Sequence, residues 1–301
     1  MTSSMVNQRI AVIVNPTAGK RRHHSVQRFV NYLEKAGCEV LIEKTRFQGH
    51  ATELARGLAD SGEYTYIVAA GGDGTIAEVA EGVIGSEAVL GVLPIGTANV
   101  FAHELSIAFN EIQNAADIIK GHWVKIWPAY LFNDRKRSLS IQMIGIGIDA
   151  HIVHHISSRL KRMIGKTAYL LQTIRSLWQY PFYEMSVSIE GQATEKATAV
   201  IISKGALYAG NYRLLPWSKQ TEKAFSILLF QSPSKMNYLY AIAAFFIGKI
   251  ADCKHIKIVN TEKVKIEANP RIPIQSDGDA KGCTPATIEI STKALKVAIP
   301  A

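Results

Sequence analysis

The sequence predicts an α/β plus β architecture with two domains: a doubly wound, Rossmann-like α/β domain and then an antiparallel β-sandwich. Two observations indicate the first domain: short apolar runs alternate with amphipathic stretches, and polar or Gly-rich loops follow the runs. One observation indicates the second domain: many later segments alternate apolar and polar side chains, as half-buried strands do. The pattern changes near Gly121–Ile126, so we expect domains at residues 1–124 and 125–301.

The first half of the chain reads as repeated strand–loop–helix units. Its apolar runs are short and partly β-branched, which favours buried strands. The stretches between the runs carry apolar residues at helical spacing. This alternation predicts parallel strands joined by right-handed crossovers. We expect strands at residues 9–14, 39–43, 66–70 and 89–93, and helices at residues 25–36, 50–61, 75–84, 100–105 and 112–120.

The stretch Ile67–Val79, IVAAGGDGTIAEV, contains a Gly-rich turn between an apolar strand and a helix. Three glycines in such a turn bring bare backbone N–H groups and the positive end of a helix dipole towards an anion. The carboxylate of Asp73 would repel that anion unless a metal ion or a proton transfer used it. The stretch therefore predicts phosphate binding with a divalent cation, and an ordinary turn without a ligand is the alternative.

Four polar or Gly-rich loops follow the predicted parallel strands and begin at Asn15, Thr45, Gly71 and Gly96. Because doubly wound sheets bind ligands outside the carboxyl ends of their strands, we expect these loops to form one site. The first loop, Asn15–Lys20, has a phosphate-loop arrangement but does not match the Walker pattern. The convergence of the four loops is stronger evidence for a ligand than any one of them.

The second half of the chain is expected to be mainly antiparallel β structure, which favours a sandwich. The alternation is clear in residues 263–268, where Val264 and Ile266 alternate with charged side chains. The last strand could return to the first domain. We expect strands at residues 126–130, 139–148, 183–190, 197–204, 224–230, 255–259, 263–267, 287–290 and 295–299, and helices at residues 150–162, 167–178 and 236–248.

Composition and charge restrict the classes of partner. The chain has 301 residues, of which 48% are hydrophobic and 20% charged, as in globular proteins. The net charge of +9 favours anionic partners, but no nucleic-acid motif accompanies it, so we expect no nucleic-acid partner. The three cysteines are far apart and odd in number, which indicates a reducing compartment. Because the N-terminus also lacks a secretory apolar core, we expect a cytoplasmic protein.

Two later segments suggest contact with a membrane. The most hydrophobic run, Tyr238–Ile250, is too short to cross a bilayer, which needs about 20 residues. We expect it to be a packed helix, and a shallow membrane contact is the alternative. Basic residues follow one another from Arg159 to Arg175, with Trp178, Tyr180 and Phe182 close behind. This combination suits an anionic membrane surface, although a solvated helix beside core aromatic residues would give the same pattern.

Six short motifs occur in one order over nearly the whole chain. They are Asn15–Lys20, Gly71–Thr75, Pro94–Asn99, Gly145–Ala150, Asn211–Pro216 and Gln275–Asp279. In this order they resemble the diacylglycerol kinase catalytic-domain family, which includes sphingosine kinases, ceramide kinases and soluble bacterial lipid kinases. The Gly-Gly-Asp-Gly-Thr motif alone is shared with NAD kinases, whereas the ordered set is highly specific.

The resemblance implies a two-domain kinase that uses ATP and Mg²⁺ to phosphorylate a hydroxyl of a diacylglycerol-like or sphingoid-like lipid. The nucleotide would lie in the first domain, and the lipid in the cleft between domains. The implied partners are the lipid substrate and the inner face of the membrane, with a homodimer through sheet edges as a further expectation. The implied ATP contacts are Asn15, Gly19, Lys20, Thr45, Gly71, Gly72, Asp73, Gly74, Thr75, Gly96, Thr97 and Asn99.

Two carboxylates carry the implied chemistry. Asp73 would belong to the network of acids and water around Mg²⁺, and Asp279 falls where the family usually has a glutamate acting as general base. An alcohol is a poor nucleophile, so phosphoryl transfer needs a carboxylate within reach of its proton. The sequence Asp277-Gly278-Asp279 can present one carboxylate while the other orients the turn. By itself it would read as an ordinary β-turn.

The chain departs from the family at three places. Many bacterial members carry an aspartate where this chain has Val100, and often another where we align Ile126 or Trp127, so the magnesium network would depend more on Asp73. An aspartate-glycine pair associated with a second, structural magnesium is replaced by Glu222-Lys223. Glu222 could still ligate a metal, but Lys223 adds positive charge beside it.

Two alternatives to a lipid kinase remain at this point. An NAD kinase-like enzyme would share the Gly-Gly-Asp-Gly-Thr motif, but we find no Asn-Glu pair of the kind NAD kinases carry in their second region. A lipid- or nucleotide-binding protein without turnover is suggested by Val100 and Lys223, and the retained Asp73 and Asp279 argue against it. The identity of the lipid does not follow from the nucleotide motifs.

Overall fold

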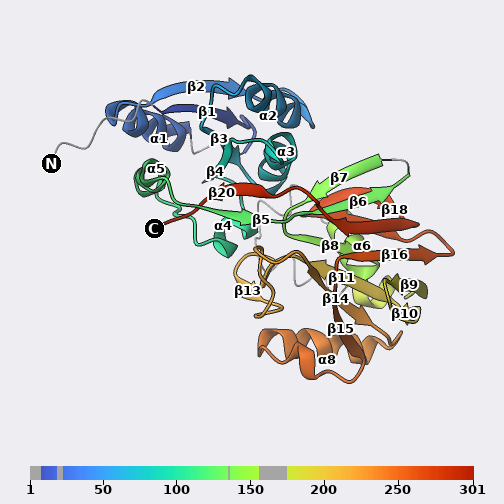
Figure 1. The fold of residues 1–301 in the computed structure, drawn as a ribbon. Coiled ribbons are helices and arrows are strands. Elements are labelled where there is room, and N and C mark those ends of the chain that lie inside the picture. Colours follow the sequence, from blue (N-terminus) through green and yellow to red (C-terminus); the bar gives the residue numbers. More distant parts are fainter. Residues whose placement is uncertain (1–7, 19–22, 135, 156–174) are drawn as a thin grey trace. The chain divides into compact units, whose positions relative to one another are not determined.

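The computed structural model describes residues 8–18, 23–134, 136–155 and 175–301. The chain divides into two compact units (Figure 1). The first unit contains the chain up to Pro128 together with residues 209–211 and 291–301. The second unit contains residues 129–208 and 212–290. The chain thus leaves the first unit after Pro128 and returns to it at Ser291 to finish its sheet.

The first unit is built on a six-stranded sheet in the order β2-β1-β3-β4-β20-β5. Strands β1 to β4 are parallel, β20 pairs parallel with β4, and β5 pairs antiparallel with β20. The α/β class predicted for this part of the chain is confirmed. The strands are β1 (Arg9–Val14), β2 (Glu39–Lys44), β3 (Tyr66–Gly71), β4 (Val89–Pro94), β5 (Trp123–Ile126) and β20 (Leu295–Ala298).

Helices pack on this sheet through small and apolar residues. Helices α2 and α3 approach closely at Gly82, where a Cβ atom would lie 2.6 Å from the Cβ of Ala55. Helix α5 is capped at its start by Asn110, whose side chain accepts hydrogen bonds from two backbone N–H groups, and at its end by Gly121 with φ 79°. These are standard capping arrangements. The helices are α1 (His23–Lys35), α2 (His50–Ser61), α3 (Asp73–Val83), α4 (Val100–Glu104) and α5 (Glu111–Lys120).

The second unit is a β-sandwich of two antiparallel six-stranded sheets, ordered β10-β9-β16-β19-β6-β7 and β15-β14-β11-β8-β17-β18. Alternate side chains of both sheets, such as Val187 and Ile227, meet in one buried core. The predicted sandwich is therefore confirmed. The strands are β6 (Ala129–Asn133), β7 (Lys136–Ser140), β8 (Met143–Ile146), β9 (Met185–Ile189), β10 (Glu195–Ala197), β11 (Ala199–Ser203), β14 (Phe225–Phe230), β15 (Ile256–Thr261), β16 (Lys263–Ala268), β17 (Pro273–Ser276), β18 (Asp279–Cys283) and β19 (Ala286–Ile290).

Short elements complete the second unit. A two-stranded ribbon joins β12 (Leu207–Tyr208) to β13 (Tyr212–Arg213). Helix α6 (Ile148–His155) follows β8, α8 (Lys235–Phe246) follows β14, and a 3₁₀ turn, η1 (Ile250–Asp252), precedes β15. Within the described ranges, no helix combines the length and the apolar character needed to cross a bilayer.

Two of the expected strands are wrong in detail. Residues 126–130 are not one strand, because β5 ends at Ile126 in the first unit and β6 begins at Ala129 in the second. Pro128 between them has no N–H group to donate to a ladder. Residues 139–148 are also not one strand: β7 and β8 are separated by a turn, and helix α6 then begins at Ile148.

The expectation of a membrane patch around Arg159–Arg175 is wrong for two of its three aromatic residues. Tyr180 and Phe182 are buried in a small core with Tyr238, so they do not face a membrane. Trp178 is exposed, as the patch requires. Apart from Arg175, the basic residues of the expected patch lie outside the described residues.

Candidate functional site

The first and third loops of the predicted nucleotide site, those at Asn15 and Gly71, are joined by a hydrogen bond. Asn15 follows β1, and its Nδ2 donates to Oγ1 of Thr75, 3.0 Å away in the first turn of α3. The Asn15 Oδ1 accepts from the N–H and hydroxyl of Thr17, which fixes the amide orientation. The backbone N–H of Asn15 also donates to the carbonyl of Ala70 at the end of β3. The structure therefore brings Asn15 and Thr75 together, as the loop convergence predicted.

The third and fourth loops touch through glycines. A Cβ atom on Gly96 would overlap the Cα of Gly72, and one on Gly72 would lie 3.3 Å from the Cα of Gly96. The carbonyl of Gly71 accepts hydrogen bonds from the N–H groups of Ile95 and Gly96. Glycine is required at both positions because the two backbones meet without room for a side chain. Such a surface of bare backbone suits close approach to a phosphate.

Asn99 shapes the fourth loop from within. It is buried in the left-handed region with φ 46°, a conformation that asparagine tolerates better than most residues. Its Oδ1 accepts from Gly96 N, and its Nδ2 donates to Gly96 O, both at 3.1 Å. Asn99 is therefore used within its own loop, while Thr97 beside it is exposed. The predicted contact of Thr97 with a ligand stays a prediction, and its side chain is open to solvent.

Asp73 lies where two helices begin. It opens α3, and its Oδ1 accepts a hydrogen bond from the N–H of Phe101 in the first turn of α4, 3.2 Å away. Burial raises the pKa of Asp73 above its ordinary value, and the backbone N–H groups of residues 99–101 and of Asp73 itself oppose that rise. The carboxylate thus links the Gly71–Thr75 loop to the loop at Asn99.

The donor set at Asp73 fits a magnesium ion only in a limited way. Among the described residues, no three His, Cys, Asp or Glu side chains gather into a metal-ligand cluster. Mg²⁺ at nucleotide sites is held by one or two carboxylates together with substrate phosphates and water. A single carboxylate beside a phosphate-binding loop meets that minimum, so Asp73 is the residue that would hold the ion.

Two of the remaining predicted nucleotide contacts, Thr45 and Gly74, lie at the same edge of the sheet. Thr45 follows β2 and donates its backbone N–H to the carbonyl of Val14. Gly74 lies in the first turn of α3 between Asp73 and Thr75. Gly19 and Lys20 lie outside the described residues, so their predicted contacts stay predictions.

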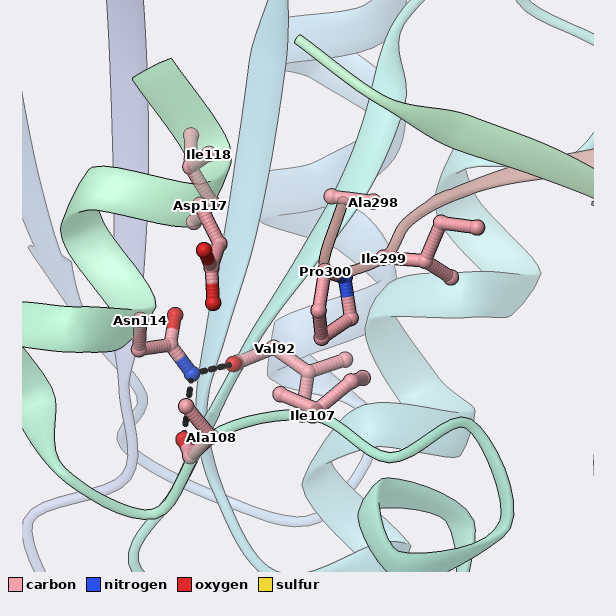
Figure 2. A pocket seen from close by; sticks show the side chains of 9 residues that line it. All are labelled: Val92, Ile107, Ala108, Asn114, Asp117, Ile118, Ala298, Ile299 and Pro300. Atoms are coloured by element: carbon pink, nitrogen blue, oxygen red, sulfur yellow. Dashed lines mark hydrogen bonds between the residues drawn. The ribbon is translucent and has the colours of Figure 1, made fainter. Parts of the chain in front are cut away.

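A small hollow elsewhere in the first unit does not belong to this site (Figure 2). Residues of β4, α5 and the C-terminal segment line it, and none of the predicted ATP contacts is among them. Its polar wall is already used: Asn114 Nδ2 donates to the carbonyls of Val92 and Ala108 at 2.8 and 2.9 Å. These bonds anchor α5 to the sheet, so we interpret the hollow as structural.

In the second unit, Asp277 and Gly278 form the two-residue turn between β17 and β18. Both have positive φ, 51° and 87°, as in the type I′ turn that Asp-Gly favours in hairpins. The Asp277 carboxylate accepts from the hydroxyl of Ser140 and from the backbone N–H groups of Ile141, Gln142 and Met143. Asp277 therefore caps the turn between β7 and β8.

Asp279 has different surroundings. It is exposed at the start of β18, and within the described part of the chain its carboxylate has no hydrogen-bond or ion-pair partner. The two carboxylates of the turn thus divide as the sequence suggested: one orients the turn, and one faces outward. The carboxylate of the predicted base is therefore open to solvent, and its role stays a prediction.

A buried carboxylate missed by the sequence reasoning lies behind this turn. Asp149, in the first turn of α6, accepts from Gln275 Nε2 at 2.7 Å and from the hydroxyl of Tyr208 at 2.5 Å. Burial raises its pKa, and these two donors oppose the rise. Gln275 Oε1 in turn accepts from Gly278 N at 2.9 Å. One glutamine side chain therefore ties the buried acid to the turn that carries Asp279.

Gly145 explains why this arrangement is encoded in a short motif. A Cβ atom at Gly145 would overlap Oδ2 of Asp149 and lie 2.8 Å from Gln275 Nε2. The bare strand lets the Asp149 side chain fold back from α6 onto β8. The spacing of Gly145 and Asp149 across a strand-to-helix turn was the available sequence signal, but the partner Gln275 is 126 residues away.

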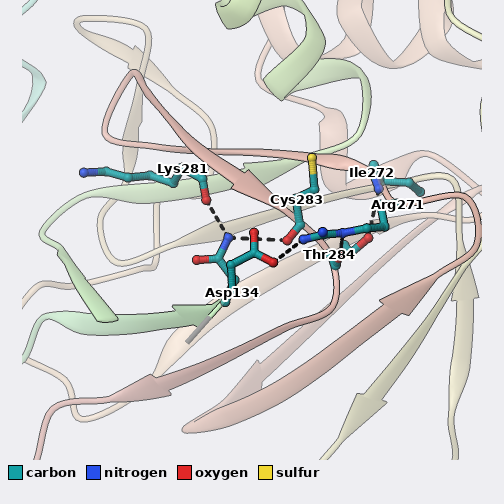
Figure 3. A network of polar contacts seen from close by, with 7 residues as sticks. Asp134, Arg271, Ile272, Lys281, Cys283 and Thr284 are labelled. Carbon is teal, nitrogen blue, oxygen red and sulfur yellow. Dashed lines mark hydrogen bonds and ion pairs between the residues drawn. The ribbon is translucent and has the colours of Figure 1, made fainter. Parts of the chain in front are cut away.

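The other end of the β17–β18 hairpin is fixed by a polar network, shown in Figure 3. Arg271 pairs with Asp134, and its Nε donates to the carbonyl of Thr284 at 2.7 Å. Thr284 Oγ1 accepts from the backbone N–H of Ile272. Asn133 at the end of β6 donates to the carbonyl of Lys281. The hairpin carrying Asp279 is therefore held at both ends to β6, β7 and β8.

The loop expected to hold a second metal is contacted by a buried lysine that follows β11. Lys204 Nζ donates to the backbone carbonyls of Glu222 and Ala224 at 2.7 and 2.6 Å. Burial lowers the pKa of Lys204 to about 8, and the Glu222 carboxylate opposes that shift. The Lys204 ammonium group already donates hydrogen bonds to carbonyl oxygens of the kind that ligate a metal. The residues present therefore do not fit a second cation at Glu222.

Comparisons with known proteins agree with the geometry. The diacylglycerol kinase catalytic domain family matches residues 9–129, and the YegS C-terminal NAD kinase beta sandwich-like domain matches residues 142–299. The second match alone covers more than half of the chain. The diacylglycerol kinase of Bacillus subtilis (strain 168) is 26% identical over 298 residues, which cover 97% of each chain. The diacylglycerol kinase of Staphylococcus carnosus (strain TM300) is 26% identical and covers 93% of this chain and 92% of its own.

Solved structures share the fold. One protein of Bacillus anthracis str. Sterne superposes with a TM-score of 0.81 at 24% identity, covering 97% of this chain and 95% of its own. A diacylglycerol kinase structure from the same strain superposes with a TM-score of 0.72 at 21% identity, covering 97% of both chains. Taken with the domain matches, the chain belongs to the diacylglycerol kinase catalytic-domain family, the lipid kinases that its ordered motifs resemble.

Proposed function

We propose that this protein is an ATP- and Mg²⁺-dependent lipid kinase that phosphorylates a hydroxyl of diacylglycerol at a membrane surface. The observation that carries the proposal is the backbone contact of Gly72 with Gly96 beside the carboxylate of Asp73. It joins two loops at the carboxyl edge of the parallel sheet into a surface suited to nucleotide phosphates. The choice of diacylglycerol follows the names of the curated relatives.

In this proposal the first unit binds and orients the nucleotide. The N-terminus of α3, opened by Gly72, directs N–H groups and a positive dipole end towards the phosphates. Thr97 and Thr45 supply hydroxyls at the same edge. Mg²⁺, held by Asp73 with the phosphates, would neutralise negative charge on the transferred group. The bond between Asn15 and Thr75 keeps the first loop in position.

The second unit supplies the base. The lipid hydroxyl oxygen forms a bond to the γ-phosphorus, the bond from that phosphorus to the β,γ-bridging oxygen breaks, and ADP leaves. Asp279 accepts the proton of the attacking hydroxyl. Asp277 and Gln275 do not touch the reacting atoms in this scheme. They position the turn from which Asp279 projects.

The test is transfer of labelled γ-phosphate from ATP to diacylglycerol in mixed micelles with Mg²⁺. We expect a labelled lipid with the native chain and a loss of roughly a hundredfold or more with Asp73→Asn, since one essential electrostatic contact has that effect on turnover. Asp117→Asn is the matched control for loss of one carboxylate, because Asp117 lies on α5, contacts Gln113 and Lys120, and touches no predicted ATP contact. Its turnover should equal that of the native chain.

Two other results would redirect the proposal. ATP binding without a labelled lipid, also with sphingoid bases and total lipid extract, would favour a binding protein that has lost turnover, as Val100 suggests. Equal turnover of Asp73→Asn and the native chain would contradict the role of Asp73. Binding of ATP is therefore measured in parallel by calorimetry.

A further inference from the structure

Helix α8 has one buried face and one exposed face, and both are apolar. Tyr238, Ala241 and Ala244 face inward and are buried. The ring of Tyr238 stacks on Phe230 with a 9° interplanar angle, and its hydroxyl lies 3.0 Å from Oγ1 of Thr198. This inner face anchors α8 beside β14 and β15 of the second unit (Figure 1).

The opposite face carries a continuous apolar stripe. Met236, Tyr240 and Ile247 are 67%, 65% and 70% exposed. With 3.6 residues per turn, the positions of the stripe lie within about 60° of one another around the helix. Phe246, beside the stripe, is also exposed. We call these residues the α8 face: Met236, Tyr240, Ala243, Phe246 and Ile247.

A surface helix normally turns polar residues to water, so an outer face of this kind indicates a partner. Between its ends α8 has Asn237 as its one strongly polar side chain, and it contains no acidic residue. The inner face alone would hold the helix in place. The ring of Phe246 also contacts the rings of Tyr212 and Phe245. The high exposure of Met236, Tyr240 and Ile247 is therefore what packing of the inner face leaves unexplained.

Cationic and aromatic groups border the α8 face at both ends. Lys235 lies 5.1 Å from the ring centre of Trp178, which is 61% exposed. Lys249 follows the helix, and Lys254 is exposed just after the 3₁₀ turn. The one acidic residue in this turn is Asp252. Lys257, further along, already pairs with Glu195. An apolar face bordered by lysines and an interfacial tryptophan is the pattern of helices that lie in the surface of an anionic bilayer.

We propose that the α8 face is a membrane-docking element that inserts its apolar stripe into the surface of an anionic phospholipid bilayer. The inference rests on the proposed function, because a kinase acting on a bilayer-embedded lipid has to dock on the bilayer. The lysines at the two ends contact lipid phosphates, and Trp178 lies at the level of the headgroups. The docking element is thus separate from the residues proposed for catalysis.

Charge favours a bilayer over a second copy of the chain. A two-fold antiparallel pairing of two α8 helices would set Lys235 of one copy near Lys249 of the other at both ends of the contact. Like charges placed opposite each other weaken an interface. An anionic surface meets the same lysines with opposite charge.

The test is co-sedimentation of the full chain with vesicles of phosphatidylcholine and phosphatidylglycerol that contain no diacylglycerol. The test variant is Met236→Ser with Ile247→Ser, which changes two highly exposed side chains. The matched control is Ile112→Ser on α5, also exposed. We expect the double variant to bind roughly tenfold or more weakly, because transfer of each such side chain into an apolar phase contributes at least that factor. Native binding should weaken with salt and with phosphatidylcholine alone.

The outcomes separate this inference from the proposed function. Turnover on a short-chain diacylglycerol dissolved as monomers should be the same for the native chain and the double variant, which supports docking alone as the role of α8. Unchanged vesicle binding of the double variant, or no binding by the native chain, would overturn the inference. So would light scattering that shows a native dimer and a monomeric double variant. Absence of turnover in all variants with the expected vesicle binding would instead refute the kinase.

Discussion

At the scale of single residues, Asp277 and Asp279 have identical side chains but different hydrogen-bond partners and exposure. The Asp277 carboxylate accepts three backbone N–H groups and one hydroxyl from residues 140–143. Asp279 is exposed and unpaired within the described chain. A carboxylate that accepts four hydrogen bonds holds the surrounding backbone in place, whereas one without such bonds is available to a substrate.

We expect substitutions of these two aspartates to separate stability from turnover. Asp277→Ala leaves several donors without an acceptor and should lower the free energy of unfolding by at least about 2 kcal/mol. Asp279→Asn should change the free energy of unfolding by less than about 0.5 kcal/mol, since exposed positions contribute little. It should nevertheless remove most of the turnover while leaving ATP binding intact. Urea denaturation, calorimetry with ATP and the micelle assay measure the three quantities; native turnover in Asp279→Asn would contradict the base.

Lys204 is a buried cation whose environment predicts an unusual pH dependence. Its Nζ donates to the carbonyls of Glu222 and Ala224, and burial lowers its pKa to about 8 from 10.5. Below the folded pKa both the folded and the unfolded chain carry the proton. Between the folded pKa of about 8 and the ordinary pKa of 10.5, the unfolded chain holds a proton on this lysine that the folded chain has released. The free energy of unfolding therefore rises with pH across this window.

Lys204→Met should remove that rise. The variant leaves two carbonyls without their donor and should be about 1–3 kcal/mol less stable at neutral pH. The difference from the native chain should then grow between pH 8 and 10.5 by as much as about 3 kcal/mol, since one unit of pKa shift corresponds to 1.36 kcal/mol. Urea titrations at a series of pH values measure it, with Lys219→Met, an exposed lysine in the loop that the Lys204 ammonium contacts, as control. A constant difference would show that Lys204 does not titrate in this window.

Residues whose chemistry is local were the ones the sequence could identify. Asp73 and the glycines beside it are contiguous in the sequence, and the Asp277-Gly278 pair by itself predicts a β-turn. Asp149 belongs to one of the six motifs, but its role does not follow from the motif, because its partners Gln275 and Tyr208 are 126 and 59 residues away. Contacts over such separations follow from sheet pairing, which a single sequence does not reveal.

At the scale of elements, the loops after β3 and β4 act as one surface. The Gly71 carbonyl accepts from Ile95 and Gly96, and the Cα atoms of Gly72 and Gly96 lie too close for a side chain. The N-terminus of α4 also donates to Asp73. Displacing either loop therefore moves the other, together with the start of α3.

Gly96→Ala should disturb this surface. The added methyl group overlaps Gly72, so the loops must separate, and we expect the affinity for ATP to fall roughly tenfold or more. Gly57→Ala on α2 is the matched control, because a Cβ there meets nothing within 4 Å. It should stabilise the protein by about 0.5–1 kcal/mol without changing ATP affinity. Calorimetric titration with ATP decides; unchanged affinity in Gly96→Ala would remove this contact from the site.

Element types were predictable where periodicity is strong, and boundaries were not where distant residues set them. The helix at residues 50–61 was predicted with its observed bounds because its apolar positions repeat at helical spacing. The break between β7 and β8 was missed because Asp277, far along the chain, organises that turn. The run 126–130 was read as one strand although Pro128 separates two sheets.

At the scale of the whole molecule, the last strand determines whether the first unit is complete. Strand β20 lies between β4 and β5, pairing parallel with one and antiparallel with the other. Leu295 and Val297 are buried in it. Without β20, β5 loses its neighbour and β4 becomes an open edge. The second unit is therefore inserted into the sequence of the first, a relation that apolar patterning could not reveal.

A chain ending at Ile290 should consequently lose nucleotide binding although every predicted ATP contact remains in it. Removal of β20, which lies between β4 and β5, exposes the buried surface of both strands, so we expect the first unit to unfold, while all the strands of the sandwich are retained. Hydrogen exchange should show rapid exchange in β1 to β4 and persistent protection in β8, β11 and β14. Deletion of Ala301 alone, an exposed residue beyond β20, is the control.

The same experiment separates a structural role of the C-terminal segment from a direct one. If residues 291–301 acted only on a ligand, the truncated chain would keep protected strands β1 to β4 and lose ATP binding alone. If they complete the sheet, protection and binding disappear together, and a peptide of residues 291–301 added in trans should restore both. The backbone bond from Ser291 N to Pro128 O, 2.8 Å long, places the start of that peptide beside the exit from β5. Joint loss and joint recovery are therefore the result we expect.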